Sequence, residues 1–249
     1  MQPHNMVPHR SGGRSRRALS LIALSVLALS MLPAAEPANP ANSAAVSYTF
    51  KPPFDAAAAG LKPLFNGKDF TGWIANPECW RIIEGTLVGT KDNQLMTTVA
   101  DYDNFRLIVC SSQADPPMNH QGIAFWGDRT PAGDYGYGDC ILFTPPNTGT
   151  WDYKLRGRAP GKVLFSRDLE KEGYTRSRWT QAELLVNRTT GTVRMAVDGI
   201  EVISYVDSDL PRRKKGPIGL QAHGGSHDVR YRDIYIEVDP KSDKLLTVK

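Results

Sequence analysis

Residues 216–238 read GPIGLQAHGGSHDVRYRDIYIEV, and this stretch decides which fold the sequence predicts. It opens with a short apolar run at residues 217–221 and continues into a polar loop that contains His223 and His227. From residue 234 to residue 238, isoleucine and valine alternate with polar side chains, which is the period of two of a half-buried β-strand. The stretch therefore predicts two strands joined by a loop that carries two imidazoles.

Strand patterns of the same kind recur along the chain, and no segment shows the period of a long helix. Residues 102–112 are the strongest example, because both faces are largely apolar, as expected for a central strand. Residues 178–205 predict a meander of three strands, with Asp198-Gly199 as a two-residue turn that needs positive φ. About ten to thirteen short strands bounded by turns are typical of an all-β sandwich or barrel, and no linker interrupts residues 61–239.

A second informative stretch, residues 64–73, reads LFNGKDFTGW. Asn66-Gly67 favours a turn with positive φ. The aromatic side chains of Phe65, Phe70 and Trp73 flank that turn and offer a large apolar area. We expect these rings to pack against the sandwich rather than to bind a ligand.

Together the two stretches resemble the 3-keto-disaccharide hydrolase family. Members of that family open on an LFNGKDLxGW-like segment and close on GPIGLQxHGxxVxFRNIxI. The resemblance covers residues 61–239 of this chain. It implies an all-β fold, a concanavalin-A-like jelly-roll β-sandwich, and an activity that cleaves glycosidic bonds in 3-keto-glycosides.

The first 35 residues have the order of a secretory signal peptide. Residues 1–17 carry four arginines and no acid, and residues 18–32 are an uninterrupted run of apolar and small side chains. Fifteen such residues are too few to cross a bilayer as a helix, so we expect export by the Sec or the twin-arginine route. Residues 36–60 then predict an Ala/Pro-rich spacer, with one helical turn ended by Gly60, and residues 240–249 predict a charged tail.

The basic balance of the chain belongs to this leader. The whole chain has 30 Lys and Arg against 26 Asp and Glu, and removing four leader arginines leaves 26 against 26. A near-neutral mature chain argues against nucleic acid or an anionic membrane as partner. The basic cluster at residues 212–215 predicts a solvated loop. Cys79, Cys110 and Cys140 have no metal-site spacing, and we expect the latter two to be buried thiols.

No motif of a serine hydrolase, a zinc protease or a phosphate-binding loop occurs, so function must lie in polar and aromatic side chains around the sheets. His223 is the first candidate, because an imidazole with a pKa near ~6.5 can act as base, acid or metal ligand. It falls on the LQxHG motif of the family, and Gln221 lies two residues earlier on the same strand face. A histidine that only ties the loop down is the alternative. Asp139 and Glu84 are further catalytic candidates.

Carbohydrate is the partner that the aromatic content favours, because sugars offer apolar faces for stacking and hydroxyls for planar polar groups. The chain has five Trp and nine Tyr residues, many of them beside predicted turns. Trp126, Tyr137 and Trp151 are the aromatic candidates for substrate binding, and His120 joins them. Packing in the core is the alternative for each ring.

The middle of the chain departs from the family. Members commonly read NSGIxFR and then GYExQIxD, whereas residues 120–127 read HQGIAFWG and residues 136–143 read GYGDCILF. Trp126, Gly138 and Cys140 thus stand where Arg, Glu and Gln are usual. The scaffold motifs match better than the site positions do.

The activity implied by the resemblance has a distinctive chemistry. A ketone at C3 of a glycoside acidifies the hydrogen at C2, so one base can remove that proton and expel the C1 substituent. Water can then add. This route needs a base and an electrophile for the enolate oxygen, either a proton donor or a divalent metal, although no ligand spacing marks a metal site. It does not need the paired carboxylates of ordinary glycosidases.

Two other classes of function stay open at this point. A non-catalytic carbohydrate-binding module fits the loss of the Arg and Glu positions and a fold shared with lectins. A structural or adhesive domain of a larger extracellular complex fits the same fold. Turnover of a 3-keto-glycoside distinguishes the first hypothesis from both.

Overall fold

The computed structural model describes residues 54–90, 94–113, 121–129, 139–145, 149–153, 162–169, 171–174, 179–223 and 228–248. All of them belong to one compact unit, Ser43–Lys249. The predicted signal peptide, residues 1–35, lies outside the described residues, as do His120 and Tyr137.

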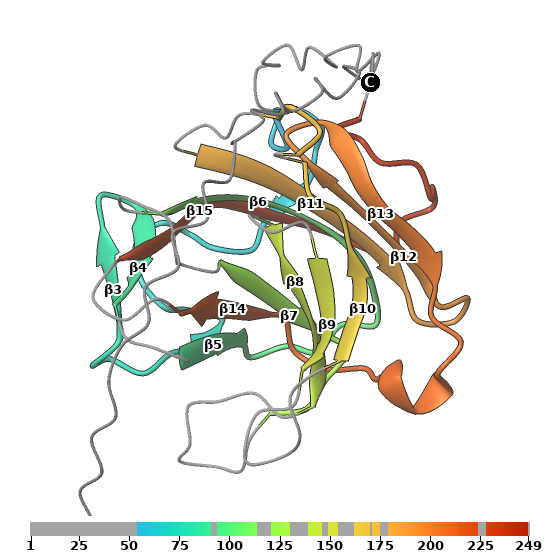
Figure 1. Cartoon of the computed structure of the whole chain (residues 1–249). Helices are drawn as coiled ribbons and strands as arrows, with labels where there is room; N and C mark the ends of the chain where they lie inside the picture. Colours follow the sequence, from blue (N-terminus) through green and yellow to red (C-terminus); the bar gives the residue numbers. More distant parts are fainter. Residues whose placement is uncertain are drawn as a thin grey trace, which may run out of the picture. The chain divides into compact units, whose positions relative to one another are not determined.

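Two antiparallel sheets face each other, which confirms the predicted all-β jelly-roll sandwich (Figure 1). Sheet A has the strand order β13-β12-β11-β6-β15-β4-β3, with β1 added on β15, and sheet B has the order β10-β9-β8-β7-β14-β5-β2. The strands of sheet A are β1 (Lys62–Pro63), β3 (Trp80–Ile83), β4 (Thr86–Gly89), β6 (Asn104–Gln113), β11 (Trp179–Asn187), β12 (Thr192–Val197), β13 (Ile200–Val206) and β15 (Val229–Val238). The strands of sheet B are β2 (Trp73–Ile74), β5 (Gln94–Thr98), β7 (Gly122–Phe125), β8 (Cys140–Thr144), β9 (Gly149–Tyr153), β10 (Lys162–Ser166) and β14 (Gly219–Ala222).

Helix is nearly absent from the part of the chain that the structure describes. Its named helix is the short 3-10 helix η2 (Leu210–Arg212), which follows β13. No helix among these residues is long and apolar enough to cross a membrane.

The stretch at residues 216–238 supplies one strand to each sheet. Strand β14 lies between β5 and β7 in sheet B, and β15 lies between β6 and β4 in sheet A. The loop between them therefore passes from one layer to the other. A bulge in β15 sits between Arg232 and Tyr235, where Asp233 adopts a φ of 51°.

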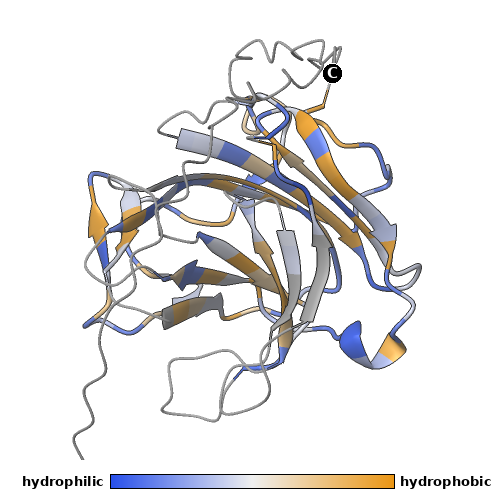
Figure 2. Ribbon diagram, viewed as in Figure 1, coloured by the Kyte–Doolittle hydropathy of each residue, from blue (hydrophilic) through white to orange (hydrophobic). Residues whose placement is uncertain are grey.

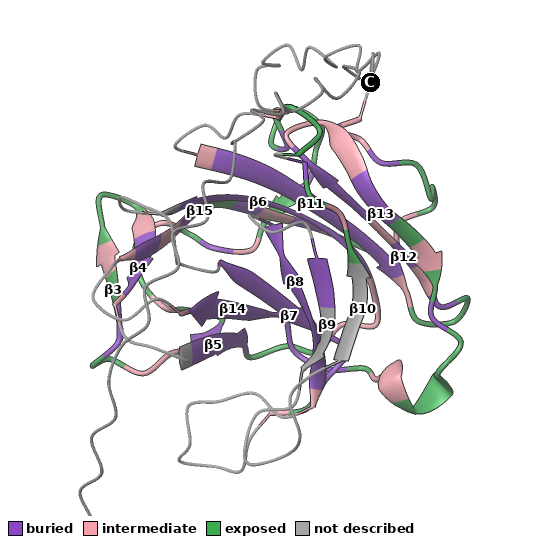
Figure 3. Cartoon of the chain, in the orientation of Figure 1, coloured by how far each residue is buried: buried purple, intermediate pink, exposed green. Residues whose placement is uncertain are grey.

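The core lies between the sheets and comes from the alternating residues that the strand patterns predict. Phe105, Leu107 and Val109 of β6 belong to one buried cluster with Ile123 and Phe125 of β7. Figure 2 shows hydrophobic and polar residues mixed along the strands, and Figure 3 shows the central strands as largely buried. Strand β6 pairs with β11 on one side and β15 on the other, so residues 102–112 contain a central strand as predicted.

Segments at both ends of the described chain cover part of the outer face of sheet A. Residues 54–61 form a helical turn closed by Gly60, whose φ is 82°, and Leu61 N donates to Ala56 O at 3.0 Å. Gln181 of β11 holds the backbone of Phe54 through its amide, with bonds of 2.8 and 2.9 Å. The end of the predicted spacer thus packs on the sandwich.

The predicted charged tail also packs on sheet A. Leu245 belongs to a buried cluster with Leu185 and Ala196, and Leu246 packs against the cluster that contains Ile108. Arg106 and Glu183, two buried charged residues of sheet A, hold the backbone of this segment.

Candidate functional site

The structure places the first two predicted catalytic residues at opposite ends of sheet B. Asp139 directly precedes β8, and His223 directly follows β14. In sheet B, Ile141 of β8 pairs with Phe125 of β7, and Ile123 of β7 pairs with Leu220 of β14. Extending these antiparallel registers places Asp139 level with residue 216. His223 lies seven residues farther along, which at the rise of a β-strand is about 23 Å away. One small substrate group cannot contact both.

Glu84, the third predicted catalytic residue, lies elsewhere again. It occupies the turn between β3 and β4 in sheet A, where it is exposed and has a φ of 48°. Gly85 follows with a φ of 73°, so the pair forms a hairpin turn with positive φ at both positions. The sequence predicted three catalytic residues, and the fold gives them three separate places.

The end of sheet B at His223 is held in place by a buried tyrosine. The hydroxyl of Tyr231 donates to Gln221 O at 2.5 Å and accepts from Gly122 N at 3.1 Å. Burial raises the pKa of Tyr231 above its ordinary value of 10.0, so the hydroxyl stays protonated. His223 itself is half-buried.

Gln221, predicted to bind substrate, is 2% exposed, and its Oε1 has no hydrogen-bond partner among the described residues. A Cβ atom on Gly122 would lie 2.5 Å from that oxygen, so a larger residue there would displace the Gln221 amide. The Gln221 side chain therefore lies across β7 on the outer face of sheet B.

That outer face is mostly apolar in this chain. Leu95, Ala124, Cys140 and Leu142 form a small buried cluster on it, separate from the main core. Cys140 stands where the family resemblance leads one to expect a glutamine. Position 140 therefore offers a thiol with 2% exposure instead of an amide.

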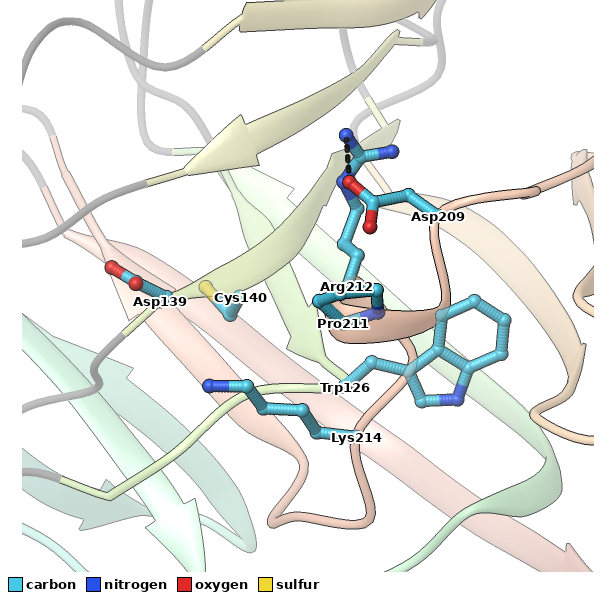
Figure 4. Close-up of a pocket in the computed structure, with 7 residues that line it drawn as sticks. All are labelled: Trp126, Asp139, Cys140, Asp209, Pro211, Arg212 and Lys214. Atoms are coloured by element: carbon cyan, nitrogen blue, oxygen red, sulfur yellow. Dashed lines mark ion pairs between the residues drawn. The ribbon is translucent and has the colours of Figure 1, made fainter.

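A cavity of about 250 Å³ lies at the other end of sheet B (Figure 4). It is lined by Trp126, Asp139, Cys140, Asp209, Pro211, Arg212 and Lys214. The first three come from the end of β7 and the start of β8, and the others from η2 and its flanks. The cavity thus joins two segments that are about seventy residues apart in the sequence.

The cations of the cavity are held by neighbouring carboxylates. Arg212 pairs with Asp207, which is 3% exposed, at 3.1 Å and with Asp209 at 3.0 Å. Lys214 pairs with Asp128, which follows β7. The basic cluster predicted to be a solvated loop is therefore half-buried at Arg212 and Lys214. Both head groups are fixed before any ligand binds.

Trp126 forms a wall of the cavity. It is 1% exposed, has a φ of 52°, and its Nε1 donates to Asp103 O at 3.2 Å. Figure 4 shows its ring turned away from Asp139 and Cys140. The tryptophan that replaces the arginine of the family thus mainly packs at the end of the sandwich.

The remaining predictions fall on parts that the structure describes incompletely. Tyr137 and His120 lie outside the described residues, and of Trp151 the structure describes the backbone, in β9. They stay predictions. The sequence did not predict Asp209, Arg212 and Lys214 as site residues. The only signal there is a run of basic residues, and a local run cannot show that the segment lies beside β8 in the fold.

The metal option finds no support in the described residues. They contain no group of three or more His, Cys, Asp or Glu side chains that could hold a metal ion.

Comparison with known proteins relates the chain to carbohydrate-associated proteins. A family model described as a 3-keto-alpha-glucoside-1,2-lyase-like domain matches residues 60–237. A candidate glycosyl hydrolase of Parabacteroides distasonis is 16% identical, with a TM-score of 0.56, over 76% of this chain and 98% of that one. A second from the same organism is 21% identical, with a TM-score of 0.51, over 71% and 98%.

A carbohydrate-binding module, CBM66 of Bacillus subtilis, is 16% identical, with a TM-score of 0.50, over 68% of this chain and 97% of that one. At these identities the three structures show a shared fold. No curated protein matches the sequence.

Proposed function

This chain belongs to the family of 3-keto-alpha-glucoside-1,2-lyase-like domains, and we propose that it cleaves 3-keto-glycosides in the cavity beside Asp139. In the proposed reaction a base removes the proton at C2, which the C3 ketone acidifies. The electron pair forms the C1–C2 double bond as the C1 oxygen leaves with its substituent and takes a proton from water, which gives the free alcohol. Water then adds to the unsaturated sugar.

The observation that carries this proposal is the convergence of a carboxylate and two cations on one cavity. Asp139 supplies the base, and Lys214 or Arg212 stabilises the negative charge that develops on the ketone oxygen. Arg212 and Lys214 are pre-positioned by their own carboxylate partners, so little reorganisation is needed.

The size of the cavity supports a single sugar ring as the group that enters. Its volume of about 250 Å³ lies just below the range of about 300–1,000 Å³ that drug-sized ligands occupy. Trp126, Pro211 and the Cys140 thiol form its uncharged walls, and the other four lining side chains are charged. Such a charged lining suits a polar ligand such as a sugar.

Because Asp139 and His223 lie far apart, substituting each in turn tests which of them takes part in the reaction. Purified protein is incubated with a 3-keto-glucoside, with and without EDTA, and release of the C1 alcohol is followed. Asp139→Asn should lower turnover by at least ~100-fold, the low end for loss of a general base. His223→Ala should leave turnover within a factor of about two, because residue 223 lies about 23 Å from the cavity.

The control is Asp168→Asn, which changes an exposed carboxylate outside the cavity and should have no effect. Full turnover in Asp139→Asn would sink the proposed base. Loss of turnover in His223→Ala alone would move the reaction to the other end of sheet B.

Carbohydrate binding without cleavage is the second candidate, and the apolar outer face of sheet B favours it. The buried cluster of Leu95, Ala124, Cys140 and Leu142 contains no carboxylate or imidazole that could act as a base. In this case wild-type protein turns over no 3-keto-glycoside, yet calorimetry shows saturable sugar binding. Lys214→Met, which removes a cation from the cavity, should weaken that binding.

A further inference from the structure

A cross-strand row of five residues runs over the outer face of sheet A. Arg81 pairs with Val88, Val88 with Arg230, Arg230 with Ser112, and Ser112 with Trp179. Directly opposed residues share a face of the sheet. The row therefore crosses four strand spacings, about 19 Å in all.

The arginine side chains on this face are partly exposed to solvent. The side chains of Arg81 and Arg230 are 49% and 37% exposed, and that of Arg232, two residues along β15 on the same face, is 45% exposed. The guanidinium of Arg232 lies over the Trp179 ring, 4.0 Å from its centroid. An aromatic ring and three guanidinium groups thus share one open surface.

The row exposes its arginine side chains, whereas Val88 within it is 0% exposed, and other described segments cover the same face elsewhere. Farther along β6, Ile108 is buried under Ala56 and Leu61 from one end of the described chain, and Arg106 under the segment at the other end. Ser112, in the row itself, is also buried. The long arginine side chains provide the exposed surface there.

Arg81 and Arg230 share one internal carboxylate. Both Arg81 and Arg230 reach the same Asp228 carboxylate, at 3.2 and 3.6 Å, so their heads are held side by side. Arginine presents a planar fork that matches carboxylates. Exposed ion pairs add little stability, so the fold does not need this arrangement and an incoming carboxylate can share it.

We propose that this row, Arg81, Arg230 and Arg232 with Trp179, binds a carboxylated polysaccharide strand, a chain of uronate sugars. The occupant is a polysaccharide because three guanidinium groups, two sharing Asp228 and one paired with Asp233, lie beside an aromatic ring along a row about 19 Å long. The heads of Arg81 and Arg230 meet at one oxygen of Asp228, so together they bind one carboxylate of the strand, and Arg232 over the Trp179 ring contacts a neighbouring sugar. This inference rests on the proposed function only in that both concern a carbohydrate ligand. It does not require that the protein cleaves that ligand.

The test measures binding of polygalacturonate to the full-length protein by calorimetry. Arg81→Gln with Arg230→Gln should weaken binding by at least ~10-fold, as expected for the loss of two charge-assisted contacts. Lys68→Gln with Lys171→Gln is the matched control, since it also removes two exposed cations but leaves the row intact. Binding should be lost at about 1 M salt, where the Debye length is about 3 Å.

A second variant tests the proposal even if the double mutant loses binding only because it misfolds. Asp228→Asn releases both arginines from their internal carboxylate, so it should bind polygalacturonate more tightly than wild type. Equal binding by wild type and Arg81→Gln/Arg230→Gln overturns the proposal, and so does equal binding of methyl-esterified and free polygalacturonate.

The proposed function can fail separately. Asp139→Asn should retain polygalacturonate binding, and Arg81→Gln/Arg230→Gln should retain turnover of a 3-keto-glycoside. Arginine-dependent binding in a protein that shows no turnover would reject the cleavage proposal and support this one. Loss of polysaccharide binding in Asp139→Asn alone would place the polysaccharide at the cavity and overturn the inference.

Discussion

Arg106 Nη1 donates to Glu183 Oε1 at 2.6 Å, with the two side chains 1% and 0% exposed. Glu183 also accepts from Leu246 N at 2.9 Å and from Thr247 N and Oγ1 at 2.8 Å. Arg106 also donates to the Lys244 and Ser242 carbonyls and to Glu237. The pair therefore anchors residues 242–247 to the outer face of sheet A through their backbone.

Glu183→Gln should destabilise the protein by about 3–5 kcal/mol, because it leaves the Arg106 charge buried without its main counter-charge. Urea unfolding measures the change. The control is Glu201→Gln, which breaks the partly exposed pair with Arg194 and should cost at most about 1 kcal/mol. Equal effects of the two substitutions would show that burial adds nothing to the Arg106 pair.

Trp73→Ala should cost about 3–5 kcal/mol, the usual range for deleting a large core aromatic. Trp73 is 5% exposed, as the sequence predicted, and its Nε1 donates to Leu64 O at 3.0 Å. The neighbouring Ile74, 40% exposed, is the control, and Ile74→Ala should cost about 0.5 kcal/mol or less. A loss below about 1 kcal/mol for Trp73→Ala would contradict its burial and reopen a ligand role.

The Asp69 turn should weaken in acid. Hydrogen bonds from the Thr71 side chain, then from Asn66, lower the pKa of Asp69 from 3.8 to about 2. Because the folded state lowers this pKa, the contribution is fully present above pH 3.8 and is lost as the pH falls to about 2. Thr71→Val should raise the pKa of Asp69, measured by NMR titration of its carboxyl carbon. An unchanged pKa would show that the Thr71 hydroxyl is not the main cause.

The strands themselves follow from the sequence, because alternation and turns are local properties of the backbone. The period of two in residues 234–238 appears as β15, and Asp198-Gly199 adopts φ values of 48° and 82° as the hairpin requires. The burial of Phe65 and Trp73 was also predictable, since large apolar side chains beside a turn have few other places to go.

The candidate site was predicted only in part. Asp139 and Trp126 do line one cavity, but Arg212 and Lys214 join them from a segment that no local pattern connects to β8. His223 carries a family motif and yet lies at the other end of β14. Which residues share a site depends on strand order and register, and these are set by pairing between distant segments.

The sequence by itself therefore determined the all-β class, the two end motifs and the list of groups that chemistry could use. Tertiary structure alone decided that Asp139 and His223 are separated, that the tail is anchored by Arg106 and Glu183, and that Arg81, Arg230 and Trp179 form one row. The physical reason is the range of the forces involved. Side-chain alternation is fixed by neighbouring residues, whereas the distance between two groups depends on which sheet each strand joins and on its register there.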